Sequence, residues 1–210
     1  MRSQVVVVAE PGRLPRIECN GGVAARGTET HTVHLISAAA TPLGGDVIAI
    51  RVVVEPGARL RLRSAAASVV LPGAETRESH SCWTIEAAGE LDVDLEPTIV
   101  AADARHLSEA RIQLGESAHL RIRERVQIGR SDEHEGFWSG ALWADRAGVP
   151  LLRHRVELGH GSVADDALGT PLACVSELRY PEATFDTPGT LMALAGGGAL
   201  GTWQGERLYP

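Results

Sequence analysis

The sequence contains no lysine, so the 20 residues counted as lysine or arginine are all arginine. A phosphate-binding Walker loop depends on its lysine, and Schiff-base catalysis depends on an amine side chain. Both kinds of chemistry are therefore excluded. The glycine run at residues 196–198 is accordingly not interpreted as a nucleotide-binding loop.

Cysteines and long apolar runs are also scarce. The three cysteines, Cys19, Cys82 and Cys174, are odd in number and widely spaced, as expected of reduced thiols in a cytosolic protein. The apolar run in the opening segment MRSQVVVVAE is too short for a signal peptide, and no later run approaches membrane-spanning length. We therefore expect a cytoplasmic protein without a membrane partner.

Aromatic residues make up 4% of the chain, whereas 44% of its 210 residues are hydrophobic. The core must therefore be built largely from aliphatic side chains, which suits many short strands. This length fits one domain over residues 1–210. The net charge of −7 argues against a nucleic acid as partner.

The segment Thr41–Gly73 organises the rest of the chain. Residues 47–54 are mostly β-branched, Glu55–Gly57 supplies a reversal, and leucines then alternate with arginines over residues 59–63. This pattern predicts a hairpin with one buried and one exposed face. Two similar units follow, one with strands at residues 80–87 and 90–95, the other with strands at residues 110–114 and 119–128.

The three units form an internal repeat in which Leu60, Leu91 and Leu120 occupy equivalent positions, with a period of about 30 residues. The sequence therefore predicts an all-β fold of stacked β-hairpins, arranged as a two-sheet sandwich or a β-helix-like domain. The outward residues are arginine in the first and third units and aspartate in the second. They form either cross-strand ion pairs or a solvated charged face.

The last part of the chain predicts two further strands and one or two short helices. The strands cover residues 139–145 and 151–158, with a turn at residues 147–150. One helical turn is expected within residues 164–168. A second helix is expected over residues 187–194, because Thr187 can cap it and Pro188 can occupy its first turn.

No set of residues predicts catalysis. Ser139 and Ser162 lie outside any Gly-x-Ser-x-Gly elbow. His80 and Cys82 share a strand face but supply two ligands where a structural metal site takes about four. The acidic run at residues 132–135 forms either a solvated loop, which is the favoured interpretation, or a patch that attracts a divalent cation weakly. We therefore nominate no catalytic residue.

Several short stretches follow one another over roughly residues 40–160. They are Pro42-Leu43-Gly44-Gly45-Asp46, Pro56-Gly57-Ala58 with Leu60, Ser64-Ala65-Ala66, Glu96-Pro97-Thr98-Ile99, Arg123-Glu124 with Gly129-Arg130, Gly136, and Gly148-Val149-Pro150-Leu151. In their order and spacing these stretches resemble the UreD (UreH) urease accessory protein family.

The resemblance implies a non-enzymatic scaffold that binds apo-urease and accessory protein F and, through F, the GTPase accessory protein G. Such a scaffold helps to deliver nickel to the urease active site through an internal polar passage. We expect homodimeric assembly within that complex, with nickel in transit and no tightly bound cofactor or tight metal site. The residues nominated for the passage or a partner surface are Asp46, Glu96, His106, Glu124, Arg130 and Glu133.

Two other functions are open on the sequence. A stand-alone nickel metallochaperone would need converging histidine and cysteine side chains. An all-β enzyme of unknown type would need a pocket in which a base lies beside a nucleophile.

Overall fold

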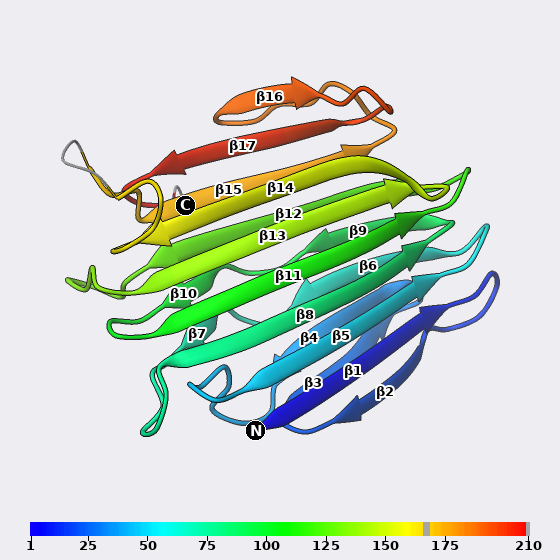
Figure 1. Cartoon of the computed structure of the whole chain (residues 1–210). Helices are drawn as coiled ribbons and strands as arrows, with labels where there is room; N and C mark the ends of the chain where they lie inside the picture. The colour runs from blue at the N-terminus through cyan, green and yellow to red at the C-terminus, as the bar shows by residue number, and fades with distance from the viewer. Residues whose placement is uncertain (166–168, 209–210) are drawn as a thin grey trace.

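A computed structural model describes residues 1–165 and 169–208. The described residues form strands joined by turns and loops, with no helix among them. The strands make two sheets that lie face to face, with the N-terminus at the bottom of Figure 1 and the last strands at the top. The all-β, stacked architecture predicted from the sequence is confirmed.

The seven-stranded sheet has a parallel centre and an antiparallel strand at each edge. In their order across the sheet, its strands are β14 (Val149–Gly159), β13 (Phe137–Arg146), β11 (Arg105–Leu114), β8 (Glu78–Ala87), β5 (Val47–Val54), β1 (Arg2–Ala9) and β2 (Arg16–Asn20).

The ten-stranded sheet faces it and also has parallel strands at its centre. Its main path is β16 (Thr190–Ala193), β17 (Ala199–Gly205), β15 (Ala173–Tyr180), β12 (His119–Ile128), β9 (Glu90–Asp94), β6 (Arg59–Ser64), β4 (Thr32–Ser37) and β3 (Val23–Glu29). Beside this path, β10 (Thr98–Val100) pairs with β12 and with β7 (Ser68–Val70).

The three repeat units are arches rather than hairpins, so that part of the prediction is wrong. In each unit the first strand lies in the seven-stranded sheet and the second in the ten-stranded sheet: β5 with β6, β8 with β9, and β11 with β12. Each strand pairs in parallel with its equivalent in the next unit. The predicted equivalence is confirmed, because Leu60 pairs with Leu91 and Leu91 with Leu120.

The end of the chain differs from the prediction in one element. The helix expected over residues 187–194 is wrong, because β16 pairs there with β17. Backbone pairing along β17 outweighs the local capping signals of Thr187 and Pro188. The helical turn expected over residues 164–168 includes residues 166–168, which lie outside the described residues. The hairpin of β13 and β14 is confirmed, with Ala147 and Gly148 at positive φ in its turn.

The outer face of the ten-stranded sheet carries the predicted cross-strand ion pairs. Asp92 contacts Arg63 at 2.5 Å and Arg121 at 3.2 Å, and Asp94 contacts Arg121 at 3.1 Å and Arg125 at 3.2 Å. These arginines and aspartates come from different units of the repeat, so the pairs join neighbouring units. Because these side chains are partly exposed, each pair contributes up to about 1 kcal/mol.

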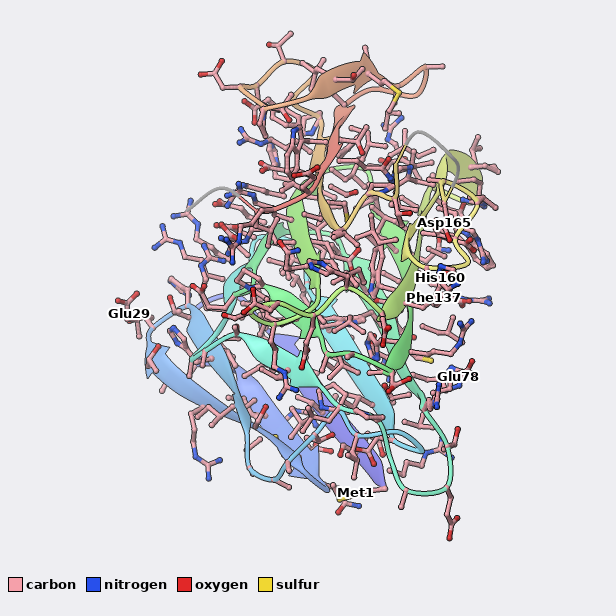
Figure 2. The ribbon with its side chains drawn as sticks, turned by 90° about the vertical axis from the view of Figure 1, so that its left-hand side faces the viewer. Met1, Glu29, Glu78, Phe137, His160 and Asp165 are labelled. Carbon is pink, nitrogen blue, oxygen red and sulfur yellow. The ribbon has the colours of Figure 1, made fainter. Side chains whose placement is uncertain are left out.

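The space between the sheets holds two apolar clusters. The larger apolar cluster includes Leu60, Leu91 and Leu120. The smaller apolar cluster comprises Val70, Val100, Ala104, Val126, Ile128, Trp138, Val156, Leu158 and Cys174. Figure 2 shows the two layers from the side, with Glu29 of the ten-stranded sheet on the left and Glu78 and Phe137 of the seven-stranded sheet on the right.

Candidate functional site

A cavity of about 290 Å³ lies between the two sheets, lined by side chains of both. Among its polar lining residues, six lie in the inward phase of β8, β11, β12, β14 and β15. We call this set the polar belt: Ser81, His106, Ser108, Glu124, His154 and Ser176.

The polar belt separates the two apolar clusters. On β12, Ile122 belongs to the larger cluster and Val126 to the smaller one, and Glu124 lies between them in the same inward phase. On β15, Ser176 lies in the same way between Cys174 and Leu178. Because every second residue of a strand faces the same side, the polar residues occupy positions that apolar residues would fill in an ordinary core.

His106 is held by two serine hydroxyls. Its Nδ1 atom lies 2.9 Å from Ser79 Oγ, and its Nε2 atom lies 3.1 Å from Ser81 Oγ. Burial, with a smaller contribution from the charge of His80, lowers the pKa of His106 to about 4. The imidazole is therefore neutral at pH 7, and its two serine neighbours satisfy both ring nitrogens.

Glu124 is the carboxylate of the polar belt. Ser108 Oγ donates a hydrogen bond to Glu124 Oε1 at 3.3 Å. Burial raises the pKa of Glu124 to about 7, and the hydrogen bond from Ser108 opposes this shift. Protein encloses the side chain, yet Glu124 keeps some accessible surface because it faces the cavity. Burial thus moves the ionisation of the Glu124 carboxyl group toward neutral pH.

His154 completes the belt on the edge strand β14. Its Nε2 atom lies 3.4 Å from Ser176 Oγ, across the space between the sheets. Burial lowers the pKa of His154. The belt therefore presents two imidazoles, one carboxyl group and three hydroxyls to the cavity.

The cavity reaches the surface where the ten-stranded sheet parts. Residues 65–67 lie between β6 and β7, and residues 95–97 lie between β9 and β10, so both segments leave the sheet at the same level. Ser64 Oγ ties them together by accepting a hydrogen bond from Glu96 N at 2.9 Å. Glu96 is exposed and lines this opening together with the three alanines of residues 65–67.

Three of the six residues nominated from the sequence line the cavity: Glu96 at the opening, and His106 and Glu124 in the polar belt. The other three make local contacts. Asp46 is buried and accepts hydrogen bonds from Thr41 Oγ1 and Leu43 N, and it pairs with the α-amino group of Met1.

Arg130 and Glu133 pair with each other in the loop after β12. This ion pair, together with hydrogen bonds from the backbone amides of Ala102 and Arg130, lowers the pKa of Glu133 to about 2. Glu133 therefore fastens its loop to the neighbouring loop at Ala102.

Sequence reasoning missed four members of the polar belt: Ser81, Ser108, His154 and Ser176. The signal that identifies them is strand phase. His154, for example, has the same parity as Leu152 and Val156, which places it on the inward face of β14. A polar residue in the inward phase of a strand marks either a hydrogen-bonded core group or the wall of a cavity.

The donors of the belt are spread out rather than gathered. Among the described residues, no group of three or more His, Cys, Asp and Glu side chains is placed to hold one metal ion. His80 pairs with Glu78 at 3.1 Å on the outer face of β8. His106, Glu124 and His154 therefore present their donor atoms singly, each from a different strand.

The family model described as "UreD urease accessory protein" matches residues 23–179 of this chain. The chain belongs to the UreD urease accessory protein family. The family resemblance noted in the sequence is confirmed, and membership supports a urease accessory role.

Proteins named UreD are similar to most of the chain. "Urease accessory protein UreD 1" of Saccharopolyspora erythraea is 35% identical over 211 residues, covering 96% of this chain and 80% of that protein. The UreD protein of Frankia alni is 38% identical over 169 residues, covering 72% of this chain and 52% of its own length. That of Frankia casuarinae is 35% identical over 176 residues, with 76% and 55% covered. The chain thus spans about half the length of the two Frankia relatives.

These relatives are all named as accessory proteins of urease. Within the described residues there is no helix long and apolar enough to cross a membrane.

Proposed function

We propose that this UreD-family protein is a non-enzymatic cytoplasmic scaffold that binds apo-urease and accessory protein F, and accessory protein G through F. In this role nickel passes through the cavity to reach the urease active site. The observation that carries the proposal is the polar belt, which lines a cavity between two apolar clusters.

The chemistry of the belt supports Ni²⁺ as the cargo. An apolar interior opposes the entry of a divalent cation, because an unpaired charge in a low-dielectric medium is strongly unfavourable. Imidazole nitrogens suit nickel, and carboxylate oxygens supply negative charge. His106, Glu124 and His154 present these groups from three different strands. An ion that contacts them in turn is attracted without being trapped.

The opening supports entry from solvent or from a partner. Glu96 is exposed at the rim, so its carboxylate attracts a cation toward the cavity. The wall then changes from the alanines of residues 65–67 to the polar side chains of the belt. Nickel is on this view a substrate in transit, and the protein needs no tightly bound cofactor.

Co-purification tests the scaffold. We expect the tagged protein, co-expressed with its cognate urease subunits and accessory proteins F and G, to recover all of them, with G lost when F is omitted. Size measurement of the recovered complex tests the homodimeric assembly. Recovery of neither urease nor F would contradict the scaffold.

A substitution that fills part of the cavity tests the passage. Ala110 lines the cavity from β11 and gives no side-chain hydrogen bond, so Ala110→Phe fills space without removing a polar contact. Thr84→Phe on the exposed outer face of β8 is the matched control. We expect Ala110→Phe to recover urease normally while the nickel content and activity of that urease fall severalfold. Equal nickel transfer by both variants would contradict the passage.

A further inference from the structure

One wall of the cavity is a tryptophan packed over a glycine. Trp138 and Gly140 lie two residues apart on β13, so both face the space between the sheets, and both line the cavity. Trp138 is 1% exposed and belongs to the smaller apolar cluster. Its indole is therefore a fixed part of the wall rather than a side chain in solvent.

Gly140 has no room for a side chain because the indole occupies that space. A Cβ atom at Gly140 would lie 2.1 Å from Cη2 and 2.2 Å from Cζ2 of Trp138. Real Cβ contacts are essentially never closer than 3.0 Å. The edge of the six-membered ring thus fills the space beside Gly140, and this position requires glycine.

The neighbouring strands restrict where a displaced ring can go. Trp138 is flanked in register by His106 on β11 and Leu158 on β14, and Gly140 is flanked by Ser108 and Val156. The β13 backbone closes the side behind the ring. The free direction is away from β13, into the cavity that Glu124 and Ser176 line from the facing sheet.

We propose that the indole of Trp138 sets the bore of the passage, and that Gly140 keeps the passage open by letting this ring lie against the strand. Because Gly140 has no side chain, the indole of Trp138 can stay beside the strand and out of the passage. This inference rests on the proposed function, since it assigns the width of the nickel passage to one pair of residues.

The pair is tested in the co-expressed urease complex with Gly140→Ala, Trp138→Leu and the double variant. We expect Gly140→Ala to change the near-ultraviolet circular dichroism of the protein, because the ring moves, and to recover urease normally. The nickel content of that urease should fall severalfold. Trp138→Leu removes the indole and should transfer at least as much nickel as the wild type. The double variant should do the same, because the side chain that blocks the passage is absent.

The double variant separates a blocked passage from general damage to the fold. A fold defect caused by the Cβ atom alone would persist in it, whereas a blockage by the indole would not. A double variant that transfers as little nickel as Gly140→Ala overturns the proposal. Should Gly140→Ala fail to accumulate, the double variant is expected to accumulate and to transfer normally, and its failure to do so likewise overturns it.

Ala110→Phe distinguishes this inference from the passage itself. If Ala110→Phe lowers nickel transfer while Gly140→Ala, with a shifted tryptophan signal, does not, the passage stands and the role of Trp138 is wrong. If neither variant lowers transfer, the proposed passage fails as well.

Discussion

The space between the sheets is filled differently at one end and in its middle, although alternating strands build both. At the leucine end, Leu60, Leu91 and Leu120 stack in register and are at most 3% exposed. In the middle, between the two apolar clusters, inward positions of β8, β11, β12, β14 and β15 carry the polar belt. The strand alternation is the same at both levels. The backbone repeat therefore specifies the fold, and the choice of inward side chain decides whether a level becomes core or cavity wall.

The stacked leucines and the polar belt also contribute differently to stability. Apolar burial stabilises the leucine end in proportion to the area removed from water. Buried polar groups destabilise a protein unless they are hydrogen-bonded, and His106 has two serine partners for this reason. The apolar clusters on both sides hold the belt in place. Variants at the leucine end and in the polar belt should therefore change stability in opposite directions.

The largest effect is expected at the leucine end. Leu91→Ala removes a 1%-exposed side chain from the middle of the stack, and we expect the free energy of unfolding to fall by about 3 kcal/mol through lost burial and the cavity left behind. Chemical denaturation measures this loss. The exposed Thr84→Ala on β8 is the control and should change stability by no more than about 0.5 kcal/mol. A Leu91→Ala loss as small as that of the control would contradict the stacked core.

The next effect is expected at Glu124 in the polar belt, where a substitution should raise the free energy of unfolding instead of lowering it. The pKa of Glu124 is about 7 in the folded protein, against 4.5 as its ordinary value. The folded state therefore binds the proton more tightly, and the stability of the wild type falls as the pH rises from about 4.5 to 7. Glu124→Gln cannot ionise, so it should gain up to about 3 kcal/mol over the wild type above pH 7, and little near pH 4.

Denaturation measured across this pH range tests the expected gain. His106 provides an internal reference, because its lowered pKa of about 4 makes stability fall as the pH drops from about 6.5 to 4. Glu124→Gln should leave that acid-side loss in place while flattening the profile on the neutral side. If the free energy of unfolding of Glu124→Gln changes with pH near neutrality as steeply as that of the wild type, Glu124 is not buried in the manner described.

The smallest effect is expected on the outer face of the ten-stranded sheet. Asp94→Asn weakens two cross-strand ion pairs, those with Arg121 and Arg125. Because these side chains are partly exposed, the free energy of unfolding should fall by about 1 kcal/mol, and by less at high salt. Denaturation at low and at 1 M sodium chloride measures the difference. A loss that does not depend on salt would argue for packing rather than charge.

The repeat and its register could be predicted from the sequence because alternation and spacing are local properties. Leu60, Leu91 and Leu120 were placed at one level by their positions in the sequence alone. The arches could not be distinguished from hairpins, because a Pro-Gly turn can join two strands of the same sheet or two strands of different sheets. Pairing decides between them, and here each strand pairs about 30 residues away. The strand β16 was missed for the same reason, because β17 supplies its partner.

The residues nominated from the sequence lie in different parts of the structure. Glu96, His106 and Glu124 were nominated and line one cavity, whereas Asp46 and Glu133 organise loops. Resemblance to a family does not distinguish residues that line a cavity from residues that hold loops in place, because a shared fold depends on both. Ser176 and His154 were missed because they meet across the two sheets, and that meeting depends on how the sheets face each other.

The length of the cavity wall follows from the register of β8, β11 and β13. Ser81, Ser108 and Gly140 are successive partners across these three strands, and neighbouring strands lie about 4.8 Å apart. Each of these strands therefore contributes one step of about 5 Å across the wall. Inserting a whole repeat unit would lengthen the wall by one such step and leave its cross-section at the other steps unchanged.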